Sequence, residues 1–431
     1  MQGGATARLP DPGEGLAARY SRVRAGTMAL AEGLSAEDMT VQSMPDASPV
    51  KWHLAHTSWF FETFLLTPGL PGYRPFHPSF GYLFNSYYEA VGARHPRPMR
   101  GLLTRPGVAE VIAYRRHVDE AMAALLAQGR EEPAALVALG LAHEEQHQEL
   151  IVMDLLHLLS LNPLAPAWKP MRRPAPCEAD PGRWLSFDGG IRSIGWDGSH
   201  HGSHCGGGFA FDNEGPRHEV LLRPFRLFSR PVTNGEWLAF IEAGGYGEPS
   251  LWLSDGWAAV QAQGWQAPAY WRRRDDGWTG FTPAGDLPFD PDAPVCHVSF
   301  YEADAFARWA GKRLPLEAEW EVAAEGLEPA GNTLGSGLLR PAAAPARRDG
   351  RPGQMFGDVW EWTASAYSPY PGFRPAAGAV GEYNGKFMAN QMVLRGGCCA
   401  TPDGHVRASY RNFFYPHQRW MFAGVRLAED A

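Results

Sequence analysis

The chain has 431 residues, of which 45% are hydrophobic and 20% are charged, a composition typical of a soluble globular protein with room for two domains. Its net charge of −8 argues against nucleic-acid or anionic-membrane partners, because these call for a basic surface. A signal-peptide pattern, a membrane-length apolar run and a CxxC pattern among the five cysteines are all missing from the sequence, so we expect a cytoplasmic protein.

Apolar residues recur at helical spacing through the N-terminal part of the chain. Ser48-Pro49 and Glu132-Pro133 place a proline near a helix start, where its missing N–H costs nothing. The pattern predicts an antiparallel four-helix bundle over residues 1–161, with a long connection between its second and third helices. The four expected helices cover residues 14–34, 48–66, 107–129 and 132–161.

A proline-rich stretch over residues 162–184 comes next and predicts a linker. Residues 185–431 then change character, with short strand-like runs and many Gly, Pro and Trp residues. Only residues 299–311 and 315–326 are convincing helices in this part. This composition indicates an irregular α+β domain whose short elements pack through aromatic residues.

The fourth predicted helix carries the sequence LAHEEQHQEL, in which His143, Glu144 and His147 fit the pattern H-E-x-x-H. Two histidines four residues apart share one helix face and can hold one metal ion. In a zinc metalloprotease the glutamate is the catalytic base. However, the positions where a metzincin needs a glycine and a third histidine hold Glu149 and Met153, and the helix then gives way to the proline-rich linker.

The better third ligand lies upstream, because the second predicted helix contains His53 and His56. Facing helices of a bundle often build a metal site together. A site of three neutral imidazoles suits Fe(II), Zn(II), Ni(II) or Cu(II), so the ligand type leaves the metal open. Zinc hydrolysis with the HEEQH motif stays an alternative on these residues alone.

Three N-terminal stretches resemble the DinB-like bundle of the ergothioneine-biosynthesis sulfoxide synthases, also called hercynine oxygenases. They are SPVKWHLAHTSWFFETFLL, LFNSYYEAVGARHPRPMRGLLTRP and HEEQHQE. The second domain is similar to the formylglycine-generating-enzyme/sulfatase-modifying fold, a C-type-lectin-like variant. That likeness rests on FDNEGPRHEV, RPVTNGEWLAFIEAGGY, LPLEAEWEVAA, GDVWEWTASAYSPYPGF and VLRGG.

The resemblance implies an Fe(II) centre with His56, His143 and His147 as ligands, and it places His53 as a non-ligand one helical turn earlier. It also implies the substrates: hercynine, which is the trimethylated betaine of histidine, a thiol, and O₂. The reaction forms a C–S bond at the imidazole ring and oxidises the sulfur to a sulfoxide. The metal assembles the reactants, which is a proximity effect.

The resemblance also suggests a proton donor. In the mycobacterial branch of the family a tyrosine just upstream of VLRGG fills this role, and here Val380 takes that position. A second branch carries a Tyr-Tyr pair in the N-terminal domain, which Tyr87 and Tyr88 match. We therefore place this chain in that branch and expect one of the pair, with a slight preference for Tyr88, to be the acid.

Further residues match family positions that bind substrate. Gln146 corresponds to a glutamine near the imidazole, and Asn412 to an asparagine near the hercynine carboxylate. Aromatic residues beside Asn412 offer cation–π surface to the trimethylammonium group, although aromatics in such a domain are more often core. Two arginines beside the tyrosine pair are candidates to clamp a carboxylate. The aromatics are Phe413, Phe414 and Trp420, and the arginines are Arg97 and Arg100.

One departure from the family pattern bears on the sulfur donor. The branch that uses γ-glutamylcysteine has an acidic residue where this chain has Phe414, so we expect cysteine. γ-Glutamylcysteine and a selenosugar remain alternative donors. A non-catalytic binding module, in which the bundle is only a scaffold, is the alternative to an enzyme. The sequence does not determine whether the protein forms a homo-oligomer.

Three other features are expected to be structural. The histidine-rich stretch at 199–205 is rich in glycine and predicts a surface loop. Cys398 and Cys399 are adjacent and do not reproduce the spaced copper-binding cysteines of formylglycine-generating enzymes. WEW at 360–362 is expected in the core of the fold.

Overall fold

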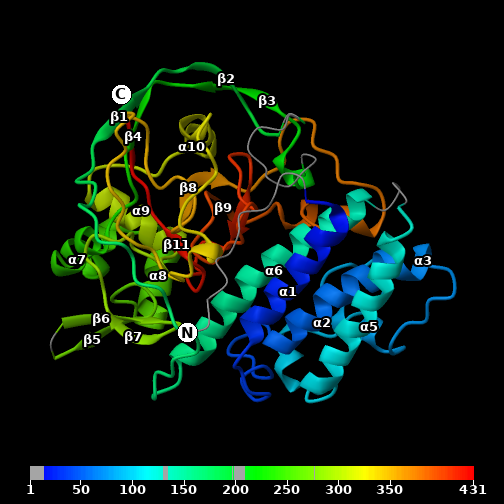
Figure 1. Ribbon diagram of the computed structural model, residues 1–431. Helices are drawn as coiled ribbons and strands as arrows, with labels where there is room; N and C mark the ends of the chain where they lie inside the picture. Colours follow the sequence, from blue (N-terminus) through cyan, green and yellow to red (C-terminus); the bar gives the residue numbers. More distant parts are fainter. Residues whose placement is uncertain (1–13, 130–133, 197, 199–208, 276) are drawn as a thin grey trace. The chain divides into compact units, whose positions relative to one another are not determined.

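The computed structural model of the protein describes residues 14–129, 134–196, 198, 209–275 and 277–431. The chain forms two compact units (Figure 1). The helical unit consists of Pro10–Trp168 and Pro375–Tyr383, and the mixed unit contains Lys169–Arg374 and Asn384–Ala431. A short segment from late in the sequence therefore belongs to the helical unit.

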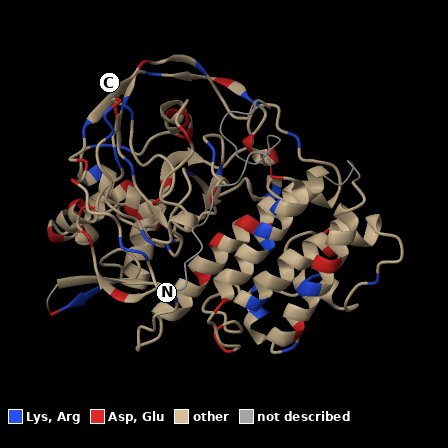
Figure 2. Ribbon diagram, in the orientation of Figure 1, with Lys and Arg blue, Asp and Glu red and all other residues tan. Residues whose placement is uncertain are grey.

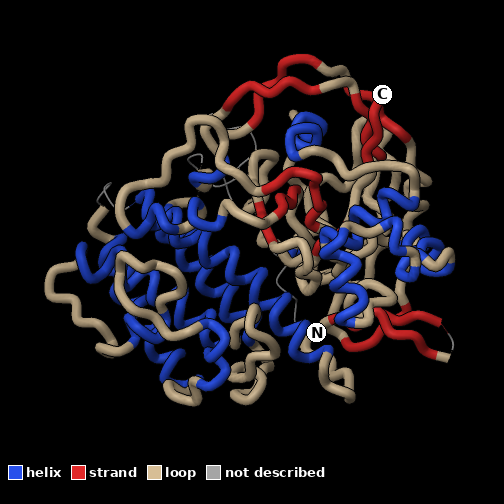
Figure 3. Tube along the Cα trace, turned by 180° about the vertical axis from the view of Figure 1, so that it is seen from behind, coloured by secondary structure: helices blue, strands red, loops and turns tan. Residues whose placement is uncertain are grey.

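The four predicted N-terminal helices are confirmed. They are α1 (Leu16–Ala31), α2 (Val50–Phe61), α5 (Val108–Leu126) and α6 (Ala134–Ser160). The long connection contains a π-helical turn η1 (Glu62–Leu66), α3 (Thr67–Gly69), α4 (Phe80–Phe84) and a 3-10 turn η2 (Arg97–Leu102). Seen from behind, this unit is built of helices and loops (Figure 3).

Helix α2 lies at the centre of the helical unit. It packs against both α5 and α6, and each of its residues is buried. A helix that is covered on every side must be largely apolar, so polar residues on it need specific partners. Among the described helices, none is long and apolar enough to cross a membrane.

The described part of the mixed unit holds four α-helices, where the sequence predicted only two. Two are the expected ones, α9 (Phe300–Trp309) and α10 (Glu317–Ala324), and the additional ones are α7 (Asn234–Glu242) and α8 (Ser254–Gln263). The prediction was wrong because α7 and α8 each contain a glycine (Gly235 and Gly256), which is a weak helix former, whereas α9 and α10 contain none. A usable signal was present: Thr233 and Glu236 form a capping box at the start of α7.

All described strands lie in the mixed unit, in four small sheets with the orders β1-β4-β12, β10-β9-β8-β11, β2-β3 and β5-β6-β7. Figure 2 shows acidic and basic positions interspersed along both units. The strands are β1 (Trp184–Phe187), β2 (Gly190–Ile194), β3 (His218–Leu222), β4 (Phe225–Phe228), β5 (Trp271–Arg274), β6 (Gly277–Thr282), β7 (Gly285–Pro288), β8 (Trp360–Ala366), β9 (Met392–Arg395), β10 (Asn412–Phe414), β11 (Ala423–Gly424) and β12 (Ala428–Asp430).

The family-like motifs of the mixed unit are structural. WEW lies on β8 with all three residues buried, which confirms the prediction, and Glu361 pairs with Arg426 at 2.7 Å. Arg395 of VLRGG is also fully buried and pairs with Glu317 at 2.8 Å. Such charges are stable inside a protein only when they are paired. The stretch 199–205 lies outside the described residues.

Candidate metal centre

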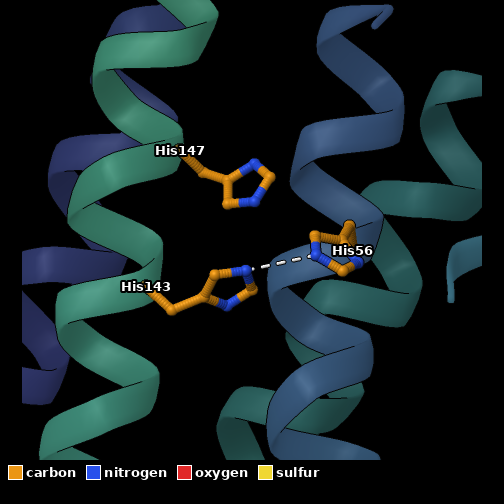
Figure 4. A group of neighbouring side chains, drawn as sticks. All are labelled: His56, His143 and His147. Carbon is orange, nitrogen blue, oxygen red and sulfur yellow. Dashed lines mark hydrogen bonds between the residues drawn. The ribbon is translucent and has the colours of Figure 1, made fainter. Parts of the chain in front are cut away.

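Three histidines meet between α2 and α6. His56 comes from α2, whereas His143 and His147 lie one turn apart on α6 and point toward it (Figure 4). One nitrogen of each ring lies within 4.8 Å of the others, and Nε2 of His56 is 3.2 Å from Nε2 of His143. All three side chains are buried. The i, i+4 spacing on α6 therefore brings a histidine pair onto the face that meets α2, as the sequence predicted.

The remaining ring nitrogens of two of these histidines are held by the protein. His56 Nδ1 lies 2.6 Å from the Phe84 carbonyl oxygen, so it carries the proton and donates. His147 Nδ1 lies 2.8 Å from His53 Nδ1. Each of these contacts leaves Nε2 facing the centre. His143 Nδ1 is buried and lacks a hydrogen-bond partner among the described residues.

The three imidazoles are neutral. Burial lowers the pKa of His143 to about 3. It also holds the pKa values of His56 and His147 well below the usual 6.5, and neighbouring histidines lower both further. A neutral imidazole offers a lone pair, which is the form that binds a metal.

This set of donors fits a metal cofactor. Three converging nitrogen lone pairs without a carboxylate make a site for a borderline first-row metal ion, and three ligands leave coordination positions for other molecules. His56 is also fixed in orientation, because its ring is stacked between Trp52 (centroids 4.5 Å apart) and Trp59 (5.4 Å). The site is therefore rigid before any ligand binds.

Glu144, the glutamate of the H-E-x-x-H pattern, does not serve this centre. Its carboxylate accepts hydrogen bonds from Arg24 at 2.9 Å, from Thr27 at 2.6 Å and from Arg115. Burial would raise the pKa of Glu144, but Arg115 and Arg24 lower it to about 2. An engaged, weakly basic carboxylate is a poor general base, which argues against the zinc-hydrolase alternative.

The two predicted tyrosines lie in the helical unit. Tyr88 is fully buried, its ring is stacked on that of Tyr87 at 4.7 Å, and it contacts Trp59 at 5.5 Å. Asn85 fixes the backbone of Tyr88 through two hydrogen bonds. The Tyr88 hydroxyl is buried and makes no hydrogen bond of standard geometry to a described residue. Burial first, and then Tyr87, hold the pKa of Tyr88 well above 10, so it is protonated at neutral pH.

A third tyrosine, which the sequence did not point to, comes from the late segment 375–383. The Tyr383 ring lies 5.6 Å from His143 and 6.2 Å from Tyr87, and its hydroxyl donates to Gln146 Oε1. The turn η7 (Ala379–Glu382) precedes it. Val380, which the sequence comparison predicted at the place of the family tyrosine, lacks a hydroxyl, whereas Tyr383, three residues further on, supplies one.

The late segment is tied down beside the tyrosine pair. The Glu382 carboxylate accepts hydrogen bonds from the backbone N–H groups of Glu89 (3.0 Å) and Ala90 (2.8 Å), which directly follow Tyr88. One side chain thus links the segment that carries Tyr383 to the loop that carries Tyr87 and Tyr88.

Of the two predicted arginines, the structure brings one close to the centre. The Arg100 guanidinium lies over the Trp52 ring at 3.3 Å, and Trp52 in turn stacks on His56. Arg100 is buried and donates to Ser48 Oγ at 2.9 Å, while its Nε has no partner among the described residues. Arg97 is exposed and donates to the Asp46 carbonyl oxygen at 2.6 Å.

The other predicted substrate residues belong to the mixed unit. Asn412, Phe413 and Phe414 form β10, which pairs with β9. The Phe413 ring is stacked on Tyr367 at 4.0 Å, and Phe414 meets Trp420 edge-on at 5.7 Å. Their contacts with hercynine stay a prediction. Cys398 and Cys399, in the same unit, are buried.

Comparison with protein families finds two matches. Residues 19–151 match the model of the DinB superfamily, and residues 185–343 and 353–431 match that of the sulfatase-modifying factor enzyme 1-like domain. Both parts of the predicted fold class are therefore confirmed.

Individual relatives cover nearly the whole chain. The hercynine oxygenase of Mycobacterium tuberculosis is 36% identical over 441 residues, covering 97% of this chain and 99% of that protein. The hercynine oxygenase of Mycolicibacterium smegmatis is 35% identical over 443 residues with the same coverage. The formylglycine-generating enzyme of Streptomyces coelicolor is 32% identical and covers 53% of this chain and 86% of that protein.

Proposed function

Because the chain belongs to the hercynine oxygenase family, we propose that it joins hercynine to cysteine and gives hercynyl-cysteine sulfoxide. In the balanced reaction, hercynine, cysteine and O₂ give the sulfoxide and water. A C–S bond forms, the imidazole C–H and the thiol S–H bonds break, and the two hydrogens leave with one oxygen atom as water. The other oxygen atom stays on sulfur.

The single observation that carries the proposal is the buried set of three neutral histidines, next to a glutamate that is locked into ion pairs. We assign Fe(II) to His56, His143 and His147, since a metal ion that activates O₂ must be redox-active, which Zn(II) is not. Bound there, Fe(II) would activate O₂ and hold the two substrates close together. The protein supplies three buried nitrogen ligands.

For the proton donor we propose Tyr88, with Tyr87 as the second choice. The Tyr88 hydroxyl is protonated at neutral pH. The place of Tyr88 supports this role, because its ring lies 5.5 Å from that of Trp59, which in turn stacks on His56. Tyr87 stacks on Tyr88 and can adjust its position.

For substrate binding we propose that Gln146 faces the hercynine imidazole and that Tyr383 fixes the orientation of its amide. Arg100 is proposed to hold the carboxylate of the thiol substrate. A buried guanidinium with an unpaired Nε needs an anionic partner, which supports this assignment. Arg97 is left as a weaker candidate, because it is exposed. Asn412, Phe413, Phe414 and Trp420 remain the proposed hercynine contacts of the mixed unit.

The test is reconstitution of the full chain with Fe(II) under anaerobic conditions, followed by hercynine, cysteine and O₂. We expect hercynyl-cysteine sulfoxide by mass spectrometry, dependent on both Fe(II) and O₂. A His143→Ala variant should lose metal and activity together. If the protein is a non-catalytic binding module, the same variant would leave metal content and ligand binding unchanged. Stoichiometric zinc in the purified protein together with no sulfoxide would overturn the proposal. Parallel reactions with γ-glutamylcysteine and a selenosugar would identify the donor.

A further inference from the structure

His53 lies on α2 one turn before His56 and is buried between the metal centre and a carboxylate. Its Nδ1 is 2.8 Å from Nδ1 of His147, and its Nε2 is 3.2 Å from Asp154 Oδ2. Both His53 and Asp154 are buried, at 2% and 5% exposure. Asp154 also accepts a hydrogen bond from the backbone N–H of Ser48 at 2.8 Å. These contacts form a continuous line from Asp154 through His53 to His147.

Only one placement of the protons on His53 and His147 leaves His147 able to bind a metal. A carboxylate only accepts hydrogen bonds, so His53 Nε2 must carry a proton and donate a hydrogen bond to Asp154. A neutral His53 then has a lone pair on Nδ1, which accepts the N–H of His147 Nδ1. His147 is left with its lone pair on Nε2, the atom that faces the centre. With the opposite tautomers, His53 would turn a lone pair toward the carboxylate and His147 would turn an N–H toward the metal.

We propose that Asp154 and His53 are positioning residues that select the metal-binding tautomer of His147 and fix its ring. This inference rests on the proposed function, because it presupposes a metal at the three histidines. It concerns residues that do not touch the metal. Partners that hold the second nitrogen of a metal-bound histidine orient its ring and raise its basicity.

The three ligands differ in how they are held, which makes the proposal specific. The second nitrogen of His56 is held by a backbone carbonyl, which no side-chain substitution removes. That of His143 has no partner among the described residues. His147 alone among the three is held by a side chain, so its support can be removed by mutation without touching a ligand.

The test measures affinity for Fe(II) or Co(II) alone, by anaerobic competition between the full chain and a chelator. His53→Phe keeps a flat ring but cannot accept a hydrogen bond, so we expect about 10–100-fold weaker binding. His53→Gln offers an amide oxygen in place of the imidazole lone pair and should recover most of the affinity. The matched control is His117→Phe, which removes a half-buried histidine of α5 that contacts the Arg74 carbonyl oxygen instead.

A double-mutant cycle tests the line itself. Asp154→Asn alone should weaken metal binding, and adding it to His53→Phe should weaken binding no further, because the connection is already broken. Unchanged affinity in His53→Phe, or no difference between His53→Phe and His53→Gln, would overturn the proposal. Wild-type protein that binds neither metal would instead refute the three-histidine centre and with it the proposed function. Thermal unfolding of each metal-free variant verifies that it is folded.

Discussion

Glu144 and Arg24 form a buried ion pair, with Arg24 Nη1 2.9 Å from Glu144 Oε2 and side chains that are 4% exposed or less. Arg115 and Thr27 occupy the other carboxylate oxygen. Glu144 therefore joins α6, the helix with two of the three clustered histidines, to α1 and α5. In a zinc protease the glutamate at this position of the motif is the catalytic base. Here the ion pair engages Glu144, which gives this glutamate a structural role.

Glu144→Gln should reduce the stability of the protein and leave its metal site intact. Removing one partner of a buried ion pair leaves the other charges buried without compensation, which lowers the free energy of unfolding by about 3 kcal/mol or more. We expect a lower urea midpoint for the metal-free protein but unchanged metal stoichiometry. Glu110→Gln, which changes an exposed glutamate on α5, is the control. Full stability with loss of activity would restore the case for a catalytic base.

The same ion pair predicts how stability depends on pH. Burial would raise the pKa of Glu144, but Arg115 and Arg24 lower it from 4.5 to about 2. Its folded-state pKa is thus below the unfolded one. The stabilisation, about 3 kcal/mol, is complete above pH ~4.5 and is lost as the pH falls toward 2. Urea unfolding should show a large difference between wild type and Glu144→Gln at pH 7 that shrinks by pH 3. A constant difference would contradict this prediction.

Tyr88→Phe should change the product and leave substrate binding largely intact. Without the buried hydroxyl the proton donor is missing, so we expect oxidised thiol to replace sulfoxide as the main product. Tyr87→Phe should have a smaller effect, and Tyr82→Phe, at an exposed tyrosine of the same region, should have none. Mass spectrometry of both products gives the ratio. An unaltered ratio in Tyr87→Phe and Tyr88→Phe would show that neither tyrosine is the acid.

Tyr383→Phe should act differently, because the Tyr383 hydroxyl holds Gln146. Loss of one hydrogen bond costs about 1 kcal/mol, or roughly fivefold in binding. We expect a KM for hercynine raised by about that factor, with the ratio of sulfoxide to oxidised thiol preserved. Tyr415→Phe, at an exposed tyrosine, serves as the control. A shift toward oxidised thiol would assign the acid to Tyr383 instead.

Phe414→Asp should alter the choice of sulfur donor. The resemblance implies that an acidic residue at this position helps to hold the glutamyl group, and a hydrogen bond to a charged group is worth about 1.5 kcal/mol, or roughly tenfold. We expect kcat/KM for γ-glutamylcysteine relative to cysteine to rise by about that factor. Phe414→Leu, which adds no charge, should leave the preference for cysteine in place. Wild-type protein that prefers γ-glutamylcysteine would refute the assignment of cysteine.

Local sequence patterns predicted much of the helical unit. The 3.6-residue periodicity located α1, α2, α5 and α6, and the i, i+4 spacing placed His143 and His147 on one face. The helices α7 and α8 were missed, because each contains a glycine, which lowers helix propensity. The choice of His56 as the third ligand depended on resemblance, since His53 lies one turn earlier on the same helix and is also a histidine.

Local sequence patterns did not predict the contacts between distant parts of the chain. Neither the ion pairs of Glu144 nor the line from Asp154 to His147 leaves a trace in local spacing. Tyr383 is 237 residues from its partner Gln146. A single sequence does not show which distant side chains meet, so these contacts are visible only in the folded structure.

Glu382, through its two backbone partners, has a consequence for cutting the protein into parts. All three histidines of the candidate centre lie in the first 150 residues, whereas Tyr383 and the side chain that anchors it come from the segment Pro375–Tyr383. A fragment that ends at Trp168 would keep the histidines but lose the hydroxyl that donates to Gln146. The helical unit is therefore complete only when the chain is intact up to Tyr383.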